Sequence, residues 1–230
     1  MGDSKGDRYE AALRAVGLGD EDLTVWRATE LPDDAFDDWL TDRVARRPSG
    51  LRARQVYGSE NVHDFARRAI LKALALGANS HVLEIGCGGG LFLRDALATG
   101  ARATGLDHSD EMVELAREAA PNAGLVVGRA ENLPFAEAQF TAVAMSIVFM
   151  FLDEPIRVLR ECRRAMRSGG ALAAYTSAPE LRGTPAAPEP IASLGHFYED
   201  EELAALARTS GLRNSTVQRD GGAQLLTAYA

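Results

Sequence analysis

The sequence predicts an α/β protein with a doubly wound, mostly parallel sheet that has helices on both faces. From Ser59 onward, short apolar runs alternate with segments of helical periodicity. Parallel strands need such crossovers, whereas antiparallel strands can be joined by a tight turn. The last two apolar segments are joined by Asp220-Gly221-Gly222, which predicts an antiparallel hairpin at the end of the sheet.

The elements follow one another in a regular order. Apolar residues at helical spacing predict a helix over residues 59–76. The segments after it are strand 81–85, helix 89–98, strand 102–106, helix 109–118, strand 124–127, strand 139–146, helix 153–166, strand 171–176 and the hairpin 212–218 with 224–229. Residues 178–195 are rich in Pro and Gly. We expect them to form a loop at the carboxyl end of the sheet, where ligands bind in such folds.

The N-terminal part is predicted to be a separate helical cap, or lid, over residues 1–57, followed by the main domain of residues 58–230. A short helix is expected over 9–16 and a stronger one over 33–47. The second has acids at its start and arginines at its end, which suits the helix dipole. Pro48 then breaks the chain.

The segment Val82–Gly90 is the most informative stretch of the chain. An apolar strand breaks into a glycine cluster, and a helix follows, as at the start of a nucleotide-binding βαβ unit. Glycine allows a sharp turn and a close approach of the backbone to a ligand, and the helix start is expected to offer free N–H groups. Asp107 ends the next strand, where a carboxylate can accept hydrogen bonds from both hydroxyls of a ribose.

A dinucleotide fits this turn less well than a cationic nucleoside ligand does. The dinucleotide fingerprint needs Gly or Ala where this chain has Leu91. Glu84 places a carboxylate just before the turn, where it would repel a pyrophosphate but tolerate a positive amino group or a sulfonium. The alternative interpretation of Glu84 is an acid that caps loop amides and binds no ligand.

These motifs resemble class I S-adenosylmethionine-dependent methyltransferases, and most closely the small-molecule branch with the ubiquinone/menaquinone and many secondary-metabolite enzymes. The resemblance covers residues 60–230 and rests on segments 82–90, 105–112, 128–135 and 159–170, which occur in the family's order. It implies a seven-stranded Rossmann-like sheet with a C-terminal antiparallel hairpin. It also implies S-adenosyl-L-methionine as cofactor.

The resemblance further implies how the methionine part of the cofactor would be held. The backbone of Gly86, Cys87 and Gly88 would lie against it, and Glu84 would help to orient its amino group. Tyr57 stands where family members often have an aromatic residue that closes over the cofactor. A ring there would gain from the attraction between a cation and an aromatic face, and ordinary core packing is the equal alternative.

The nucleoside part would lie over the next strands. By the same resemblance, Asp107 would bind the ribose, and His108 and Met112 would pack near the adenine. Ala130 would offer its backbone amide to the adenine ring, with Glu131 beside it.

Ser146 and Ile147, at the end of the fourth strand, would face the methionine part and the substrate. The chain departs from the family at Arg129, where an Asp usually accepts from the adenine amino group, so this contact falls to Glu131 or is missing. It also departs at Thr141, where the family often has Asp. The residues 149–151, Phe-Met-Phe, replace a frequent His, which predicts an apolar substrate wall.

A general base would assist transfer to a hydroxyl. His63, on the helix predicted over 59–76, and His196, after the Pro-rich loop, are the candidate catalytic residues. A surface or hydrogen-bonded structural imidazole is the favoured alternative for each. His81 is expected at the far end of the sheet. No cluster of His, Asp and Glu has ligand spacing, so no metal is predicted.

The net charge of −8 argues against a nucleic-acid partner, which would need a basic face. The best basic cluster, Arg46, Arg47, Arg52 and Arg54, is interpreted as a solvated surface. No apolar run approaches the ~20 residues of a membrane span, and the start lacks an apolar signal region. Two cysteines are too few for a disulfide framework. These observations predict a cytoplasmic monomer or homodimer with a small-molecule substrate.

The expected function is therefore methyl transfer to an O or N nucleophile, or to carbon, of a small and partly apolar molecule. The high Ala, Arg and Gly content hints at bacterial secondary metabolism. One alternative keeps the cofactor but replaces methyl transfer by cyclisation or elimination. Another is a non-catalytic methyltransferase-like partner subunit. A nicotinamide reductase is the weakest alternative.

Overall fold

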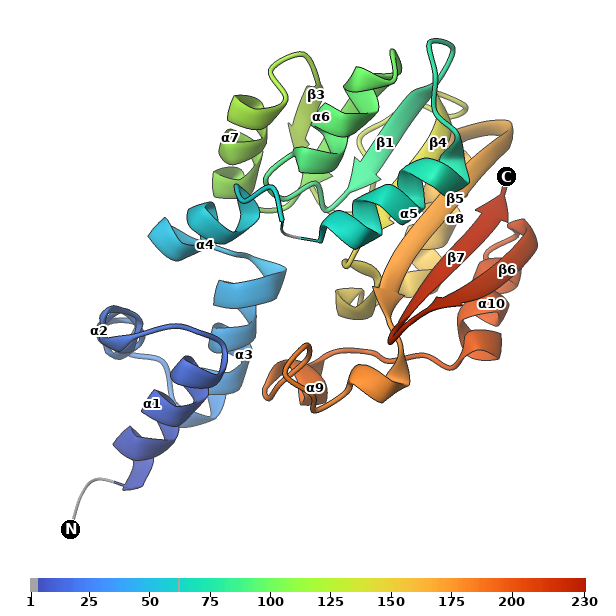
Figure 1. The fold of residues 1–230 in the computed structure, drawn as a ribbon. Coiled ribbons are helices and arrows are strands. Elements are labelled where there is room, and N and C mark those ends of the chain that lie inside the picture. Colours follow the sequence, from blue (N-terminus) through green and yellow to red (C-terminus); the bar gives the residue numbers. More distant parts are fainter. Residues whose placement is uncertain (1–3, 62) are drawn as a thin grey trace.

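The computed structural model describes residues 4–61 and 63–230, and it contains one seven-stranded sheet (Figure 1). The strands are β1 (His81–Ile85), β2 (Arg102–Asp107), β3 (Gly124–Val127), β4 (Phe140–Ser146), β5 (Met166–Ser177), β6 (Arg213–Asp220) and β7 (Ala223–Tyr229). Their order is β3-β2-β1-β4-β5-β7-β6. β1 to β5 pair in parallel, and β7 runs antiparallel between β5 and β6. The predicted fold class and the terminal hairpin are confirmed.

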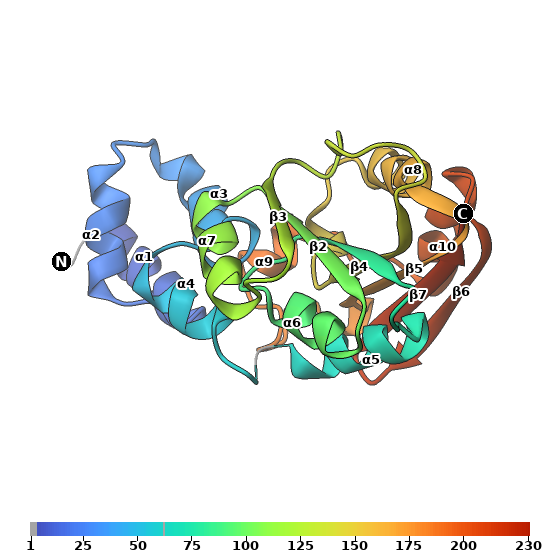
Figure 2. The ribbon, with the colours of Figure 1, turned by 90° about the horizontal axis from the view of Figure 1, so that it is seen from above.

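Helices cover both faces of the sheet, because alternate residues of its central strands are apolar on both sides. Leu83 and Ile85 pack toward α8 (Pro155–Ala165) and α10 (Asp200–Thr209). Val82 packs on the other face, toward α5 (Asp64–Leu74) and α6 (Leu91–Ala98). Figure 2 shows α5 and α6 on one side of the sheet and α8 on the other, with α7 (Asp110–Ala119) beside β3. Glu84 follows this alternation and belongs to the α5 and α6 face.

The N-terminal segment consists of α1 (Ser4–Ala15), α2 (Asp20–Ala28), the 3₁₀ turn η1 (Asp33–Ala35), α3 (Phe36–Thr41), the π-helical turn η2 (Asp42–Arg46) and α4 (Gly50–Tyr57). We call these elements the cap. Its core contains the aromatic rings of Tyr9, Trp26 and Phe36. The Phe36 centroid lies 4.3 Å from that of Tyr9 and 5.1 Å from that of Trp26. The predicted helix over 33–47 is thus interrupted, and α2 and α4 were not predicted.

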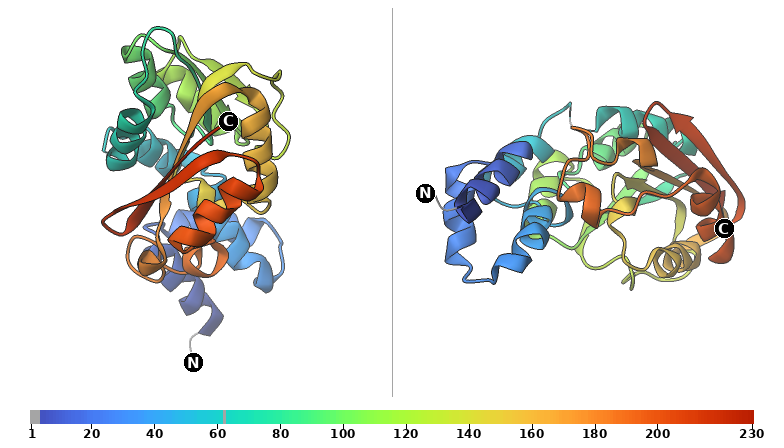
Figure 3. Two further views of the ribbon diagram at one scale, coloured as in Figure 1. Left: turned by 90° about the vertical axis from the view of Figure 1, so that its right-hand side faces the viewer. Right: turned by 90° about the horizontal axis from the view of Figure 1, so that it is seen from below.

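The cap is joined to the main domain through α4. Both carboxylate oxygens of Glu111 accept from the Gly50 N–H at 3.1 Å, and Arg54 forms an ion pair with Glu118 at 2.7 Å. Figure 3 shows the cap and α9 (Ile191–Leu194) at the same end of the molecule. The Pro-rich segment therefore lies where it was expected, after the carboxyl end of β5.

Two further predictions differ from the structure. The helix expected over 59–76 begins only at Asp64, because His63 adopts a left-handed conformation with φ of 47°. α10 had not been predicted, although its capping box and acidic first turn are typical of a helix start. In the part of the chain that the structure describes, no helix has the length and apolar character needed to cross a membrane.

Candidate cofactor and substrate site

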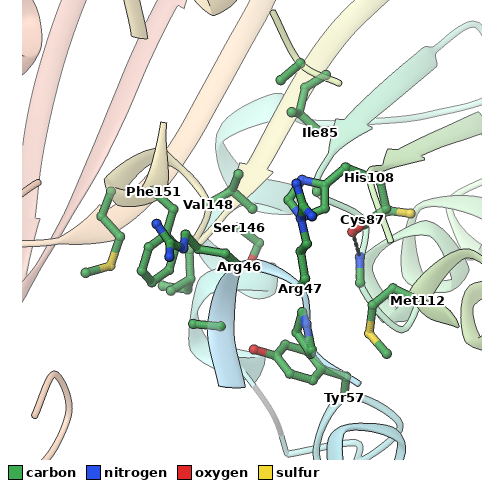
Figure 4. Close-up of a pocket in the computed structure, with 18 of the residues that line it drawn as sticks. Arg46, Arg47, Tyr57, Ile85, Cys87, His108, Met112, Ser146, Val148 and Phe151 are labelled. Carbon is green, nitrogen blue, oxygen red and sulfur yellow. Dashed lines mark hydrogen bonds between the residues drawn. The ribbon is translucent and has the colours of Figure 1, made fainter. Parts of the chain in front are cut away.

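A cavity of about 550 Å³ lies at the carboxyl ends of β1, β2 and β4, and the cap forms its opposite wall (Figure 4). The cofactor residues expected from the sequence all line it: Tyr57, Glu84, Gly86, Cys87, Gly88, Asp107, His108, Met112, Ala130, Glu131, Ser146 and Ile147. His63 also lines the cavity, whereas His196 does not. The structure therefore brings together residues from five separate segments.

The glycine turn after β1 excludes larger residues by steric contact at Gly86 and by backbone conformation at Gly88. Gly86 has φ of +67°, and a Cβ on it would lie 2.4 Å from Cγ2 of Val148. Gly88 has φ of +47°, also in the region that side chains other than glycine rarely adopt. The turn thus keeps its backbone bare toward the cavity.

The hydrogen bonds of this turn occupy three of its backbone N–H groups. The N–H groups of Gly86 and Cys87 donate to the carbonyl of Leu106 at 2.7 and 3.1 Å, and the Gly88 N–H donates to Asp107. The free N–H groups expected at the start of the following helix are a separate prediction, on which these bonds do not bear. Among the described backbone hydrogen bonds, the carbonyls of Gly86 and Gly88 accept none. Three amides of the turn are thus occupied while these two carbonyl oxygens have no backbone donor, a pattern that suits an ammonium group better than a phosphate.

Glu84 has a buried polar atom at the site that no group of the described chain satisfies. Its side chain is 3% exposed, and its Oε2 has no hydrogen-bond partner. Burial, and then the charge of Asp107, hold the pKa of the Glu84 carboxyl well above its usual range, although Arg67 acts in the opposite direction. A buried carboxylate oxygen without a donor is costly. An ammonium donor from a ligand would satisfy it, so this residue fits the amino group of S-adenosylmethionine.

Asp107 caps backbone amides of the loop, which is the role that the alternative interpretation had given to Glu84. Its Oδ2 accepts from the Gly88 N–H at 2.9 Å and its Oδ1 accepts from the Ser109 N–H at 2.9 Å. Asp107 thereby joins the glycine turn to the start of α7. Each carboxylate oxygen has two lone pairs, so a second acceptor position remains on each for the hydroxyls of a ribose.

On the adenine side, Met112 is fully buried while His108 is exposed at the cavity. Nε of Arg129 lies 3.3 Å from Oε2 of Glu131. Glu131 was expected to take over the adenine contact of the family's usual Asp. Its carboxylate is instead paired with Arg129, the residue that stands in place of that Asp. Ala130 lies between these two, at the edge of the cavity.

The end of β4 is strained at Ile147, which has φ of 56°. A β-branched residue rarely adopts this conformation, whose cost is about 1–3 kcal/mol. The Ile147 N–H donates to the carbonyl of Tyr175 at 2.9 Å, which holds the turn against β5. Ser146, Ile147 and Val148 at this turn all line the cavity.

The two candidate bases lie in different surroundings. His63 lines the cavity, and burial, together with the charge of Arg67, lowers the pKa of His63 to about 4. His196 is exposed, stacks on Tyr198 with a centroid distance of 6.0 Å, and lies outside the cavity lining. His81 lies at the amino end of β1 with Nε2 3.0 Å from Oγ1 of Thr104, as expected for a residue far from the site.

The predicted apolar wall is present only in part. Phe149 is fully buried in the core, whereas Met150 and Phe151 line the cavity. Val44 of the cap and Ile191 of α9 extend this apolar surface.

Several lining residues were missed by the sequence interpretation. Arg46 and Arg47 line the cavity. Arg47 is exposed and Arg46 is half-buried, so the solvated surface predicted for this cluster extends into the cavity. The side chain of Arg52 lies outside the described part of the structure. Arg67 is 5% exposed and donates to Asp95 at 3.1 Å. An arginine on the apolar stripe of a helix was the signal that could have identified it.

Metal chemistry has no visible basis at this site. Among the described residues, no group of three or more His, Cys, Asp or Glu side chains could hold an ion. Cys87 and Cys162 are both buried free cysteines, and burial raises the pKa of each thiol.

The sheet order, the glycine turn and the two carboxylates define a class I methyltransferase fold. Residues 83–174 match the family described as "Methyltransferase domain". This segment of the chain is thus similar to a methyltransferase domain.

Known proteins that are similar to this chain agree with that match. It is 30% identical over 135 residues to a demethylmenaquinone methyltransferase of Thermotoga maritima (58% of each chain), and 33% identical over 156 residues to a ubiquinone biosynthesis O-methyltransferase of Xanthomonas axonopodis pv. citri (59% of this chain, 64% of the relative). The matches therefore span less than two thirds of these relatives. A solved S-adenosylmethionine-dependent methyltransferase from Aquifex aeolicus has the same fold, with a TM-score of 0.62, 21% identity and coverage of 77% of this chain and 96% of that one.

Proposed function

We propose that this protein transfers the methyl group of S-adenosylmethionine to an oxygen, nitrogen or carbon nucleophile of a small, partly apolar molecule. The single observation that carries the proposal is the unpartnered carboxylate oxygen of Glu84, buried next to a turn whose Gly86 and Gly88 carbonyls accept none of the described backbone hydrogen bonds. This arrangement fits a cationic amino group and disfavours a phosphate. The quinone methyltransferases among the relatives support the substrate size.

Residues at the carboxyl ends of β1 and β2 would hold different parts of the cofactor. Glu84 and the carbonyls of Gly86 and Gly88 would hold the amino end, and Asp107 would hold the ribose. Bound in this way, the cofactor supplies an electrophilic methyl group on a sulfonium. Residues of β4 and the cap then need to align the acceptor with that methyl and exclude water.

His63 would take the proton when the acceptor is a hydroxyl. Its low pKa means that the imidazole is neutral near neutral pH and has a free lone pair. The same low pKa makes it a weak base, so we assign it to receive the proton as the bond to the methyl group forms. His196 would need to move to reach the cavity, and we give it no role in this step.

The cap would act as the lid and the determinant of acceptor choice. η2 and the residues after it form the wall that faces the glycine turn. The fold of the main domain leaves this wall free to vary, which suits a substrate-recognition element. A cytoplasmic monomer or homodimer, and a place in bacterial secondary metabolism, stay predictions from the sequence.

Methyl transfer is tested with methyl-labelled S-adenosylmethionine and a panel of phenols, amines and activated carbon acids, analysed by mass spectrometry. A product heavier by one methyl group supports the proposal. A consumed substrate whose product has unchanged or reduced mass would favour cyclisation or elimination instead. Cofactor binding with no turnover of any acceptor, alone or with added host-cell extract, would favour the partner-subunit alternative.

Two variants show whether an observed activity belongs to this site. Glu84→Gln removes the charge that would meet the cofactor ammonium, so transfer should decrease strongly. Glu201→Gln, an exposed residue on α10, changes the net charge equally and should leave the rate unchanged.

A further inference from the structure

Almost every arginine at the cavity has its charge balanced by a carboxylate of this chain. Arg46 lies 2.8 Å from Asp38 and 2.7 Å from Asp42. Arg67 is paired with Asp95 at 3.1 Å. Arg129 is paired with Glu131 at 3.3 Å. These guanidinium groups are therefore already committed to partners.

Arg47 differs from them. It lines the cavity, and among the ion pairs of the described residues none includes it. Figure 4 shows its side chain running from the cap into the cavity, in the direction of His108 and the end of β1. Arg47 is exposed, so in the free protein it is a solvated cation that borders the ligand space and is included in none of the described ion pairs.

The backbone fixes where this side chain begins. The Arg47 N–H donates to the carbonyl of Asp42 at 2.7 Å, which closes the π-helical turn. Pro48 follows and is buried, so the chain direction is restricted on both sides of Arg47. Single π-helical turns of this kind are frequent at functional sites.

The cavity that Arg47 lines is mixed in character: Asp38, Asp42 and Asp153 contribute carboxylates to it, and four other residues contribute apolar surface. Val44, Met150, Phe151 and Ile191 line the same cavity. When a ligand fills this space, the guanidinium loses water, and an anionic partner is then needed to offset that cost. A planar carboxylate matches the fork of guanidinium donors better than other small anions of single charge do.

We propose that Arg47 binds a carboxylate of the methyl acceptor, so that the acceptor is a small apolar carboxylic acid. This inference rests on the proposed function, because it assumes that an acceptor occupies the wall opposite the glycine turn. The carboxylate at Arg47 would fix the orientation of the molecule, and its apolar body would lie against Phe151 and Ile191.

The test compares matched probes by calorimetry in the presence of saturating S-adenosylhomocysteine. The probes are 3-hydroxy-2-naphthoate and its primary amide, and decanoate and decanamide, so that each pair differs in charge and little in shape. The wild type should prefer each carboxylate over its amide. Arg47→Gln should weaken carboxylate binding about tenfold or more and leave amide binding unchanged. Arg14→Gln, on the exposed face of α1, is the control with the same charge change and should keep the preference.

Two results would overturn the proposal. One is a wild-type protein without preference for either carboxylate, including the case in which no probe binds. The other is an Arg47→Gln variant that keeps the preference but loses affinity for S-adenosylhomocysteine, because the carboxylate would then be that of the cofactor. Failure of the proposed function is seen separately, as absence of S-adenosylhomocysteine binding to the wild type, and the probes can still be titrated against the protein alone.

Discussion

The carboxylate of Asp107 accepts a hydrogen bond from the backbone N–H of Gly88 at 2.9 Å. This bond joins the end of β2 to the turn after β1, and the Ser109 N–H occupies the other carboxylate oxygen. A residue placed by motif as a ribose ligand therefore also holds the shape of the glycine turn. Its substitution is expected to have two separable effects.

Asp107→Ala should weaken binding of S-adenosylhomocysteine and also lower the free energy of unfolding. Two half-buried backbone N–H groups lose their acceptor, and the penalty of about 1–3 kcal/mol for a buried unpaired donor is the upper bound for each. Urea unfolding and calorimetric titration measure the two effects on the same preparations. Asp34→Ala, an exposed residue of the cap, is the control and should change neither quantity. Unchanged stability of Asp107→Ala would contradict the structural role of this carboxylate.

Cofactor binding should release a proton from Glu84. Because burial and the charge of Asp107 raise its pKa, this carboxyl is protonated in the free protein over a wider pH range than usual, and an ammonium group favours its ionised form. The affinity for S-adenosylhomocysteine should therefore rise with pH until the raised pKa is passed. Titration in two buffers of different ionisation enthalpy counts the proton, and Glu84→Gln should abolish its release. Equal apparent enthalpies in both buffers would refute this linkage.

The same raised pKa has a consequence for stability in the absence of ligand. For an acid whose pKa is higher in the folded state, the favourable contribution is complete below the unfolded value of 4.5 and is lost as the pH rises through the folded value. In the wild type, the free energy of unfolding should therefore decrease as the pH rises through the raised pKa of Glu84. Glu84→Gln should lack this decrease. Unfolding curves of both proteins over a pH series measure this difference, and parallel pH profiles would contradict it.

His63 should stay neutral in the folded protein down to about pH 4. For a base with a lowered pKa, the contribution to stability is present above the unfolded value of 6.5 and is lost as the pH falls through the folded value of about 4. In His63→Gln, the free energy of unfolding should therefore decrease less between pH 6.5 and about pH 4 than in the wild type. His196→Gln, at an exposed position, should not show this change. An NMR titration of the His63 imidazole with a midpoint near 6.5 would show that the ring is not buried as described.

The turn should tolerate no side chain at Gly86. Gly86→Ala places a methyl group 2.4 Å from Cγ2 of Val148 and forces alanine to φ of +67°. We expect lower stability and loss of cofactor affinity. The double variant Gly86→Ala/Val148→Ala should recover only the steric part, because the backbone strain persists. Gly77→Ala is the matched control, since nothing lies within 4 Å of the added atom. Cofactor affinity in Gly86→Ala equal to the wild type would contradict the account of this turn.

The sheet was predictable because its signals are local. Each of the strands β1 to β4 is a short apolar run followed by a turn or a polar residue, and the predicted bounds of β1 and β3 agree with the structure. α4 was not predictable in the same way. It is short and rich in arginine, and its position depends on contacts with Glu111 and Glu118, which are distant in the sequence. Tertiary contacts of this kind leave no periodic pattern.

The residues of the site also divide into those that local sequence signals place and those whose position depends on tertiary contacts. Residues placed by motif, such as Glu84 and Asp107, do line the cavity, because they lie at strand ends that meet at one edge of the sheet. Arg46 and Arg47 could not be placed from the sequence. Their side chains reach the cavity only because η2 continues α3 with a wider turn and the cap then folds over the domain. The hydrogen bonds of the turn amides likewise depend on the register of β1 with β2.

The central claim is that the Glu84 carboxylate receives the amino group of S-adenosylmethionine. Calorimetric titration of the wild type and Glu84→Gln with S-adenosylmethionine, and of the wild type with NADH, tests it most directly. We predict micromolar binding of S-adenosylmethionine to the wild type, binding at least about tenfold weaker to Glu84→Gln, and no binding of NADH. Equal affinity of the two proteins for S-adenosylmethionine, or binding of NADH alone, would contradict it.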